Sequence, residues 1–220
     1  MYFRVNSDVE LYYEKVGQGS PVVLLHGNGE DLFIFDVLTK QLSLGNTVYA
    51  IDSRDHGKSS KVEGLDYNVM MEDVVAFIEG LGIQKPVLYG FSDGGIIGLL
   101  LAIKYPAMLS KLVISGANTN PNGVKREIFF LMKSVYFFTR NQKYKLMLTQ
   151  PNIADAELKT IVTPTLVLAG SKDFIKDKHT KNIAKNIRNS VLKIVEGESH
   201  TSYVVHSEKL FEIIKPFLDL

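Results

Sequence analysis

The sequence contains no cysteine among its 220 residues. It therefore cannot form a disulfide, use a cysteine nucleophile or bind zinc through thiolates. Its charges nearly cancel, with 25 basic and 24 acidic residues, so the composition gives no electrostatic reason to expect a nucleic-acid partner. No apolar run approaches the ~18 residues that a membrane-spanning helix requires. Residues 1–5 lack the basic and apolar regions of a signal peptide. These absences together indicate a cytoplasmic protein that is not an integral membrane protein.

The chain is rich in short apolar runs that alternate with helix-like segments. With 45% hydrophobic residues over 220 positions, it can bury a sizeable core as one domain, residues 1–220. From the third run onward the apolar residues are continuous, as in strands that helices cover on both faces. The first two runs alternate more and indicate an antiparallel hairpin at one edge. This alternation predicts a doubly wound α/β sheet. The predicted strands are residues 2–5, 9–16, 22–26, 47–52, 86–90, 111–115, 165–170 and 191–195, and helices are predicted at 67–81, 96–102, 174–187 and 203–218.

Residues 90–95, with the sequence GFSDGG, place Ser92 between glycines at the end of a predicted strand. A strand, a glycine-flanked serine and a helix in this order are the context of a nucleophile elbow. Small neighbours let the strand and the helix approach each other, and the helix N-terminus favours negative charge beside the serine. The simpler interpretation is a serine that caps the helix.

A serine hydroxyl becomes a good nucleophile only when a base removes its proton and a third group orients that base. Among the five histidines, His200 is favoured because it lies in the polar loop after the last predicted strand, whereas His206 falls inside a helical pattern. Asp173 follows the preceding strand and is predicted to orient His200. Asp177 is the alternative acid, and Asp173 could instead cap a helix.

An ester carbonyl that is attacked develops an oxyanion, which needs two backbone donors. The N–H of Asp93 directly follows the predicted nucleophile. The N–H of Asn28, in the run HGNG at residues 26–29, is the second candidate. Glycines at this position let the main chain approach a substrate, although the run could also be a turn that only ends a strand.

Several segments together resemble the α/β-hydrolase superfamily, in the family's order and at family-like spacing, over essentially the whole chain. They are the run 24–29 (the oxyanion loop), the turn 52–59, the elbow 90–95, the acid turn 170–173 and the loop 197–200. The resemblance implies a mostly parallel eight-stranded sheet flanked by helices. It also implies a Ser-Asp-His triad and hydrolytic chemistry that needs no cofactor, and we predict no metal site.

The segment between Gly116 and Pro164 is longer than one crossover helix requires. We predict a helical lid at about residues 118–163, because an insertion at the carboxyl ends of the strands lies over the site. Residues 127–138 are nearly all apolar, and residues 144–148 are predicted to form a second short helix. This lid is short beside those of most members of the superfamily.

Within the lid, residues 119–150 carry six basic residues and a single acid, Glu127. The elbow is similar to that of valacyclovirase-type amino-acid-ester hydrolases, which need an acidic group for the substrate's ammonium. A basic lid suits a neutral or anionic acyl group better. The basic residues could also only solvate the outer face of a helix, or attract an anionic membrane surface. The predicted substrate contacts in the lid are Phe129, Met132, Lys133 and Tyr136.

We therefore predict a serine hydrolase that cleaves small carboxylic esters through an acyl-enzyme. Ser92 attacks the carbonyl, His200 moves the proton, Asp173 orients His200, and the amides of Asn28 and Asp93 bind the oxyanion. The same triad could hydrolyse a carbon–carbon bond, an amide or a thioester. The fold also serves as a small-molecule receptor without turnover, so function has to be argued from the site.

Overall fold

In the computed structural model, which describes residues 1–219, the chain forms an eight-stranded sheet with the order β1-β2-β4-β3-β5-β6-β7-β8. β1 pairs with β2 and β2 with β4 in antiparallel fashion, and every other pairing between neighbours is parallel. The prediction of a mostly parallel eight-stranded sheet with an antiparallel edge is confirmed. The strands are β1 (Tyr2–Arg4), β2 (Glu10–Val16), β3 (Ser20–Leu25), β4 (Asn46–Ile51), β5 (Val87–Phe91), β6 (Lys111–Ser115), β7 (Thr165–Gly170) and β8 (Ser190–Val195).

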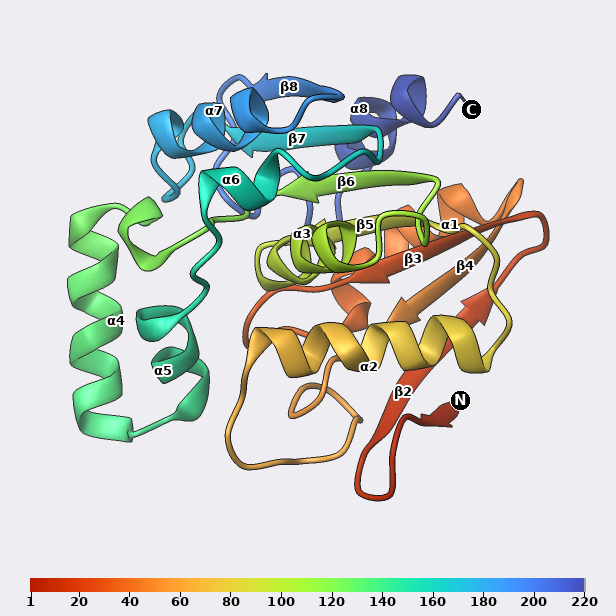
Figure 1. The fold of residues 1–220 in the computed structure, drawn as a ribbon, viewed down its shortest axis with the longest axis horizontal. Helices are drawn as coiled ribbons and strands as arrows, with labels where there is room; N and C mark the ends of the chain where they lie inside the picture. The colour runs from red at the N-terminus through yellow and green to blue at the C-terminus, as the bar shows by residue number, and fades with distance from the viewer. Residues whose placement is uncertain (220) are drawn as a thin grey trace.

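Helices cover both faces of this sheet, as Figure 1 shows. One face is covered by α2 (Tyr67–Gly80), α3 (Asp93–Lys104) and α7 (Asp177–Asn186), and the other by α1 (Asp36–Leu42) and α8 (Lys209–Leu218). Because both faces are buried, the central strands can be apolar without interruption, and β7 is buried along its whole length.

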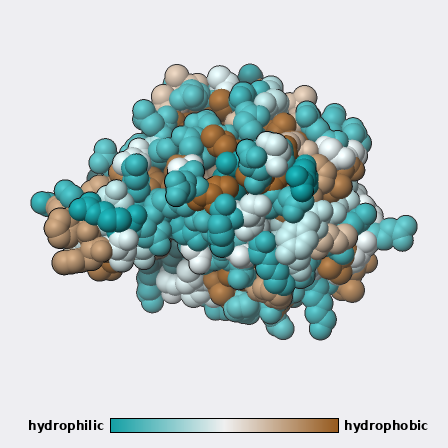
Figure 2. All heavy atoms as spheres, turned by 90° about the horizontal axis from the view of Figure 1, so that it is seen from below, coloured by the Kyte–Doolittle hydropathy of each residue, from teal (hydrophilic) through white to brown (hydrophobic). Residues whose placement is uncertain are grey.

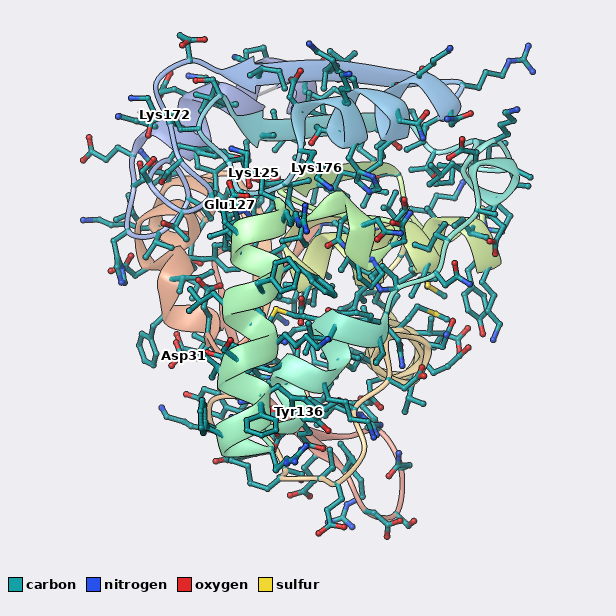
Figure 3. All side chains as sticks on the ribbon, turned by 90° about the vertical axis from the view of Figure 1, so that its left-hand side faces the viewer. Asp31, Lys125, Glu127, Tyr136, Lys172 and Lys176 are labelled. Carbon is teal, nitrogen blue, oxygen red and sulfur yellow. The ribbon has the colours of Figure 1, made fainter. Side chains whose placement is uncertain are left out.

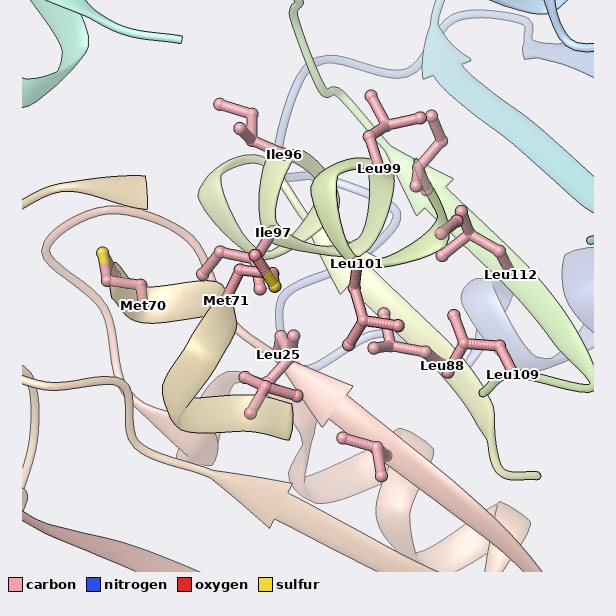
Figure 4. Packing of buried hydrophobic residues seen from close by; sticks show 14 of the residues in the cluster. Leu25, Met70, Met71, Leu88, Ile96, Ile97, Leu99, Leu101, Leu109 and Leu112 are labelled. Atoms are coloured by element: carbon pink, nitrogen blue, oxygen red, sulfur yellow. The ribbon is translucent and has the colours of Figure 1, made fainter. Parts of the chain in front are cut away.

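α3 is the most deeply buried of these helices (Figure 4). Its apolar residues lie between the sheet and α2, and each buried leucine or isoleucine side chain contributes about 1.5–3 kcal/mol through its removal from water. The packed set includes Ile96, Ile97, Leu99 and Leu101 of α3, Leu25, Leu88 and Leu112 of the sheet, and Met70 and Met71 of α2. This packing fixes the end of α3 that follows Ser92.

Two helices begin later than the sequence pattern predicts, α3 begins three residues earlier, and two short helices between β3 and β4 were not predicted. α7 begins at Asp177 rather than at 174, because Ile175 forms an isolated β-bridge with Val124. α8 begins at Lys209 rather than at 203, because residues 201–206 form turns and bury Tyr203. The 3-10 helix η1 (Leu32–Phe35) and α1 follow β3; both are too short to give a clear helical period.

The segment between β6 and β7 contains four short helices. They are η2 (Pro121–Gly123), α4 (Arg126–Thr139), α5 (Gln142–Thr149) and α6 (Asp155–Leu158). α4 and α5 pack against each other and stand beyond the carboxyl ends of the parallel strands, at the left of Figure 1. Their bounds agree with the two predicted lid helices to within a few residues. No helix within residues 1–219 is long and apolar enough to cross a membrane.

The turn between β5 and α3 is so tight that it admits only glycine at two positions. A Cβ atom at Gly94 would lie 2.2 Å from the carbonyl oxygen of Leu25, and one at Gly90 would lie 2.2 Å from the carbonyl oxygen of Gly94. Gly94 also donates its N–H to the carbonyl oxygen of His26 at 3.1 Å. These contacts hold the start of α3 directly against the end of β3.

We expect Gly94→Ala to lower the free energy of unfolding by about 3 kcal/mol, because the added methyl group would meet backbone atoms that cannot move independently. Urea denaturation followed by circular dichroism measures this change. Gly45→Ala is the matched control, since a Cβ at Gly45 meets nothing within 4 Å. Equal stability of the two variants would contradict the proposed close packing.

Candidate active site

Ser92 is the single residue between β5, which ends at Phe91, and α3, which begins at Asp93. Its backbone has φ 51° and ψ −111°, a conformation that costs a non-glycine residue about 1–3 kcal/mol. Its N–H donates to the carbonyl oxygen of Ser115 at 2.7 Å, and its own carbonyl oxygen accepts from Ile96 at 3.1 Å. The neighbouring strand and the first turn of α3 therefore hold Ser92 in the strained turn.

His200 and Asp173 lie beside Ser92, although they come from the loops after β8 and β7. His200 Nε2 is 3.1 Å from Ser92 Oγ, and His200 Nδ1 is 2.7 Å from Asp173 Oδ1. The side chain of Asp173 is 2% exposed and that of His200 is 8% exposed. The structure thus brings together the three residues that were predicted to form a triad.

The imidazole ring of His200 is held on several sides. The ring of Phe174 lies with its centroid 3.8 Å from that of His200, and the ring of Phe91 lies at 4.9 Å. At the end of β6, a Cβ on Gly116 would come within 2.6 Å of His200 Cε1, so only glycine leaves room for the ring there. The orientation of His200 is therefore set by packing as well as by Asp173.

The alternative base and acid are engaged elsewhere. His206 is exposed and its Nδ1 lies 2.8 Å from Asp36 Oδ1. Asp177 is exposed and forms an ion pair with Lys181 at 2.8 Å. Asp173 does not cap α7, whose N-cap is Lys176, although its Oδ1 also accepts from the N–H of Ile175.

Of the two amides predicted to bind an oxyanion, that of Asp93 begins α3 directly after Ser92 and that of Asn28 lies in the loop after β3. Within residues 1–219, neither the N–H of Asn28 nor that of Asp93 donates to a protein acceptor. The loops that carry them are tied together by the hydrogen bond from Gly94 to His26. Both N–H groups are therefore left without a protein acceptor among the described residues.

The side chains of the same two residues form a buried network that the sequence did not reveal. Asp93 accepts from Tyr67 Oη at 2.7 Å and from Asn28 Nδ2 at 2.8 Å, and Asn28 Nδ2 also lies 3.3 Å from the carbonyl oxygen of Lys143 in α5. Burial raises the pKa of Asp93 to about 6, against the lowering effect of its two donors. Burial and the neighbouring carboxylate raise the pKa of Tyr67, so its hydroxyl stays a donor. The network fixes the two loops relative to each other.

A cavity of about 380 Å³ opens above Ser92 and His200. Its walls are mainly apolar and come from α4, α5 and the strand ends. The lining residues are Asn28, Glu30, Phe91, Ser92, Ile128, Leu131, Met132, Val135, Tyr144, Met147, Phe174, His200 and Thr201. A small or medium-sized apolar group of a ligand fits such a space.

Of the four predicted lid contacts, only Met132 lines this cavity. Phe129, Lys133 and Tyr136 do not, because the rotation of α4 turns Ile128, Leu131, Met132 and Val135 toward it. Phe129 packs in the apolar cluster at the base of α4, and Lys133 is exposed. These three predictions differ from the structure because the sequence of α4 is apolar on more than one side.

Glu30 was not predicted as a site residue, yet it is the single carboxyl group among the lining residues. Its Oε2 accepts from the N–H of Gly27 at 3.0 Å, and burial raises its pKa. A glutamate two residues after Asn28 gives no signal by itself, since nothing local distinguishes it from a solvated side chain. The cavity therefore combines apolar walls with one acidic group in the loop after β3.

No group of three or more acidic or histidine side chains within the described residues could hold a metal ion. The nearby pair His26 and His56 is buried, with ring centroids 5.2 Å apart. Burial lowers the pKa of each to about 4, so both rings are neutral at pH 7. His26 Nε2 accepts from the N–H of Ser53 at 3.0 Å, which ties the end of β3 to the turn after β4. These histidines have a structural role.

Comparison with known proteins gives a consistent result. A family model described as alpha/beta hydrolase fold matches residues 20–146. The AB hydrolase superfamily protein YisY of Bacillus subtilis is 26% identical, with 98% of each chain covered. The human serine hydrolase BPHL is 27% identical, over 96% of this chain and 83% of the human protein. Among solved structures, Est816, described as an N-acyl homoserine lactone degrading enzyme, matches with a TM-score of 0.83 at 23% identity, covering 99% of this chain and 100% of Est816.

The buried carboxyl group of Asp93 predicts a specific pH dependence of stability. Its folded-state pKa of about 6 lies above the ordinary value of 3.8, so folding favours the protonated form. The stability from this proton is present below pH 4 and is lost as the pH rises through 6. Above that, the buried charge costs about 3 kcal/mol. The lowered pKa values of His26 and His56 make stability rise with pH over the same range. The effect of Asp93 is therefore isolated by comparing the unmodified protein with a variant at position 93.

We expect the free energy of unfolding of Asp93→Asn, measured relative to that of the unmodified protein, to increase by up to about 3 kcal/mol as the pH rises from 4.5 to 8. Urea denaturation at several pH values measures the difference. A difference between the two proteins that stays constant with pH would show that Asp93 does not titrate in this way.

Proposed function

The chain belongs to the α/β-hydrolase fold family, and on this premise we propose that it is a serine hydrolase that cleaves small carboxylic esters. The proposal rests chiefly on one observation. Ser92 Oγ, His200 Nε2, His200 Nδ1 and Asp173 Oδ1 form a continuous chain of contacts of 3.1 and 2.7 Å at the floor of an apolar cavity. This is the arrangement that a nucleophile, a base and an orienting acid require.

In the first step, His200 Nε2 takes the proton of the Ser92 hydroxyl while Ser92 Oγ attacks the ester carbonyl carbon. Asp173 accepts from His200 Nδ1–H and stabilises the imidazolium that forms. The protonated His200 then donates its proton to the departing alkoxide, which leaves as an alcohol. The acyl group remains on Ser92 Oγ.

In the second step, His200 Nε2 takes a proton from a water molecule, which attacks the acyl carbon. Collapse of this second tetrahedral intermediate returns the proton to Ser92 Oγ and releases the carboxylic acid. In both steps the negative oxygen would accept from the free amides of Asn28 and Asp93, and the N-terminus of α3 adds favourable potential. The network from Tyr67 through Asp93 to Asn28 supports this assignment, because it keeps both amides in place.

We further propose that α4 and α5 form the lid of this site and that the acyl group occupies the apolar cavity beneath them. The lining favours a neutral acyl group over an anionic one, because it includes Glu30 and no lysine or arginine. Lys133 and Arg140 are two of the six basic lid residues from which a neutral or anionic acyl group was predicted, and both are exposed and do not line the cavity.

Ser92→Ala is expected to lower kcat for p-nitrophenyl esters by about 10³–10⁶-fold, because the nucleophile is removed. Labelling by a fluorophosphonate probe is expected to vanish in the same variant. Ser134→Ala is the matched control, since Ser134 is exposed on α4 and bonds only within the helix, to the carbonyl oxygen of Phe130. Turnover near the unmodified rate in Ser92→Ala would exclude Ser92 as the nucleophile. Ligand-induced thermal stabilisation without labelling or turnover in the unmodified protein would indicate a receptor instead.

Met132→Ala is expected to raise kcat/KM for an octanoate ester relative to a butyrate ester by about tenfold, because space for additional methylene groups is worth roughly 1–3 kcal/mol. Steady-state kinetics on p-nitrophenyl esters of increasing chain length measure this ratio. Lys133→Ala changes the neighbouring residue outside the cavity and should leave the ratio unchanged. Equal effects of the two substitutions would mean that the acyl group binds elsewhere.

A further inference from the structure

The outward side of α4 carries a regular series of basic and aromatic side chains. Arg126, Phe130, Lys133 and Phe137 follow one another at intervals of four and three residues, so they lie along one line of the helix, and Arg140 follows the last residue of α4. All five are exposed, with Phe130 at 50% and Phe137 at 63%. The guanidinium groups of Arg126 and Arg140 each lie 5.4 Å from the ring centroid of Phe130 and Phe137, respectively.

Two further large apolar side chains border this line, Leu131 at 60% and Phe138 at 82% exposed. In Figure 2, brown and teal atoms lie together at the left-hand extremity of the molecule, on the side where Figure 1 places α4. A soluble monomer rarely exposes this many aromatic side chains on one short helix without a partner. The opposite side of α4 forms a wall of the cavity, so apolar side chains lie on both sides of the helix.

The charge around this face is predominantly positive. Arg126, Lys133 and Arg140 make no ion pair with a carboxylate of residues 1–219. At the start of α4, Lys125 and Lys176 lie on adjoining segments, which the hydrogen bond from Lys125 N–H to the carbonyl oxygen of Phe174 joins (Figure 3). Within residues 125–140 the one acidic residue is Glu127, against the four basic residues Lys125, Arg126, Lys133 and Arg140. The cations therefore outnumber the acids.

We propose that this outer face of α4 binds the surface of an anionic lipid bilayer. The phenylalanine rings would lie at the boundary between headgroups and acyl chains, and the basic side chains would contact anionic headgroups, as in interfacial amphipathic helices. Pairing with a second copy of the chain through the same face is disfavoured, because it would bring like charges together.

The position of the cavity gives such binding a consequence for the substrate. Leu131 lines the cavity and is also exposed beside Phe130, so the cavity mouth borders the proposed lipid contact. An ester dissolved in the bilayer could then reach Ser92 without crossing bulk water. This step rests on the proposed function, whereas the binding itself does not.

Binding is tested by sedimentation with vesicles, using Ser92→Ala protein so that no ester is consumed. We expect the partition coefficient to be at least about tenfold higher for phosphatidylcholine vesicles with 30% phosphatidylglycerol than for phosphatidylcholine alone, because several cations near the surface each contribute. High salt should remove most of this difference. Lys133→Gln/Arg140→Gln should lower the coefficient by about tenfold or more. Lys185→Gln/Arg188→Gln removes the same charge from α7 and the loop after it, and should leave the coefficient unchanged.

The contribution of the exposed phenylalanines is tested with Phe137→Ser/Phe138→Ser, which should also weaken binding. Leu44→Ser is the control, since Leu44 is 89% exposed in the turn after α1. The proposal is overturned if the protein binds neutral and anionic vesicles equally or binds neither. It is also overturned if the protein forms a dimer that this phenylalanine variant abolishes. All variants that retain Ser92 should hydrolyse water-soluble p-nitrophenyl butyrate at the unmodified rate. Failure of lipid binding with that activity intact would therefore leave the proposed function standing.

Discussion

The close contact between α3 and the carboxyl ends of β3 and β5 is the constraint on which the rest of the site depends. It requires glycine at positions 90 and 94, where backbone oxygens lie too near for any side chain. In return, the residue between strand and helix is forced into a left-handed conformation and its side chain leaves the core. The extensive burial of α3 stabilises the fold enough to offset that local strain. A looser helix would let Ser92 relax away from His200.

Around this point the protein keeps its buried polar groups either neutral or paired. His26 and His56 are held neutral by burial, and the carboxyl group of Asp93 accepts hydrogen bonds from Tyr67 and Asn28. In the turn after β4, Arg54 Nε and Nη2 donate to the carboxylate of Asp73 at 2.5 and 2.6 Å, so the two buried charges neutralise each other. The carboxyl groups of Glu30, Asp93 and Asp173 around Ser92 thus each accept a hydrogen bond from the protein.

The elements that could be predicted from the sequence are those whose pattern is local. Continuous apolar runs located the strands, and glycines around Ser92 marked the turn, because each depends on neighbours within a few residues. The rotation of α4 was not predictable, since phenylalanines occur on several of its sides and only packing decides that Met132 rather than Phe129 faces the cavity. Tyr67 and Glu30 were missed for a related reason: their partners lie on other segments or depend on a loop conformation. The catalytic roles themselves remain proposals.

The bond from the Asn28 side chain to α5 has a consequence for how this protein can diverge. The acceptor is the carbonyl oxygen of Lys143, a group that every amino acid at that position would provide. Substitutions on α5 can therefore change the cavity wall, as at Tyr144 or Met147, without removing the acceptor that holds the Asn28 side chain. A change of side chain in the cavity wall on α5 is thereby separated from the hydrogen bond that holds the Asn28 side chain.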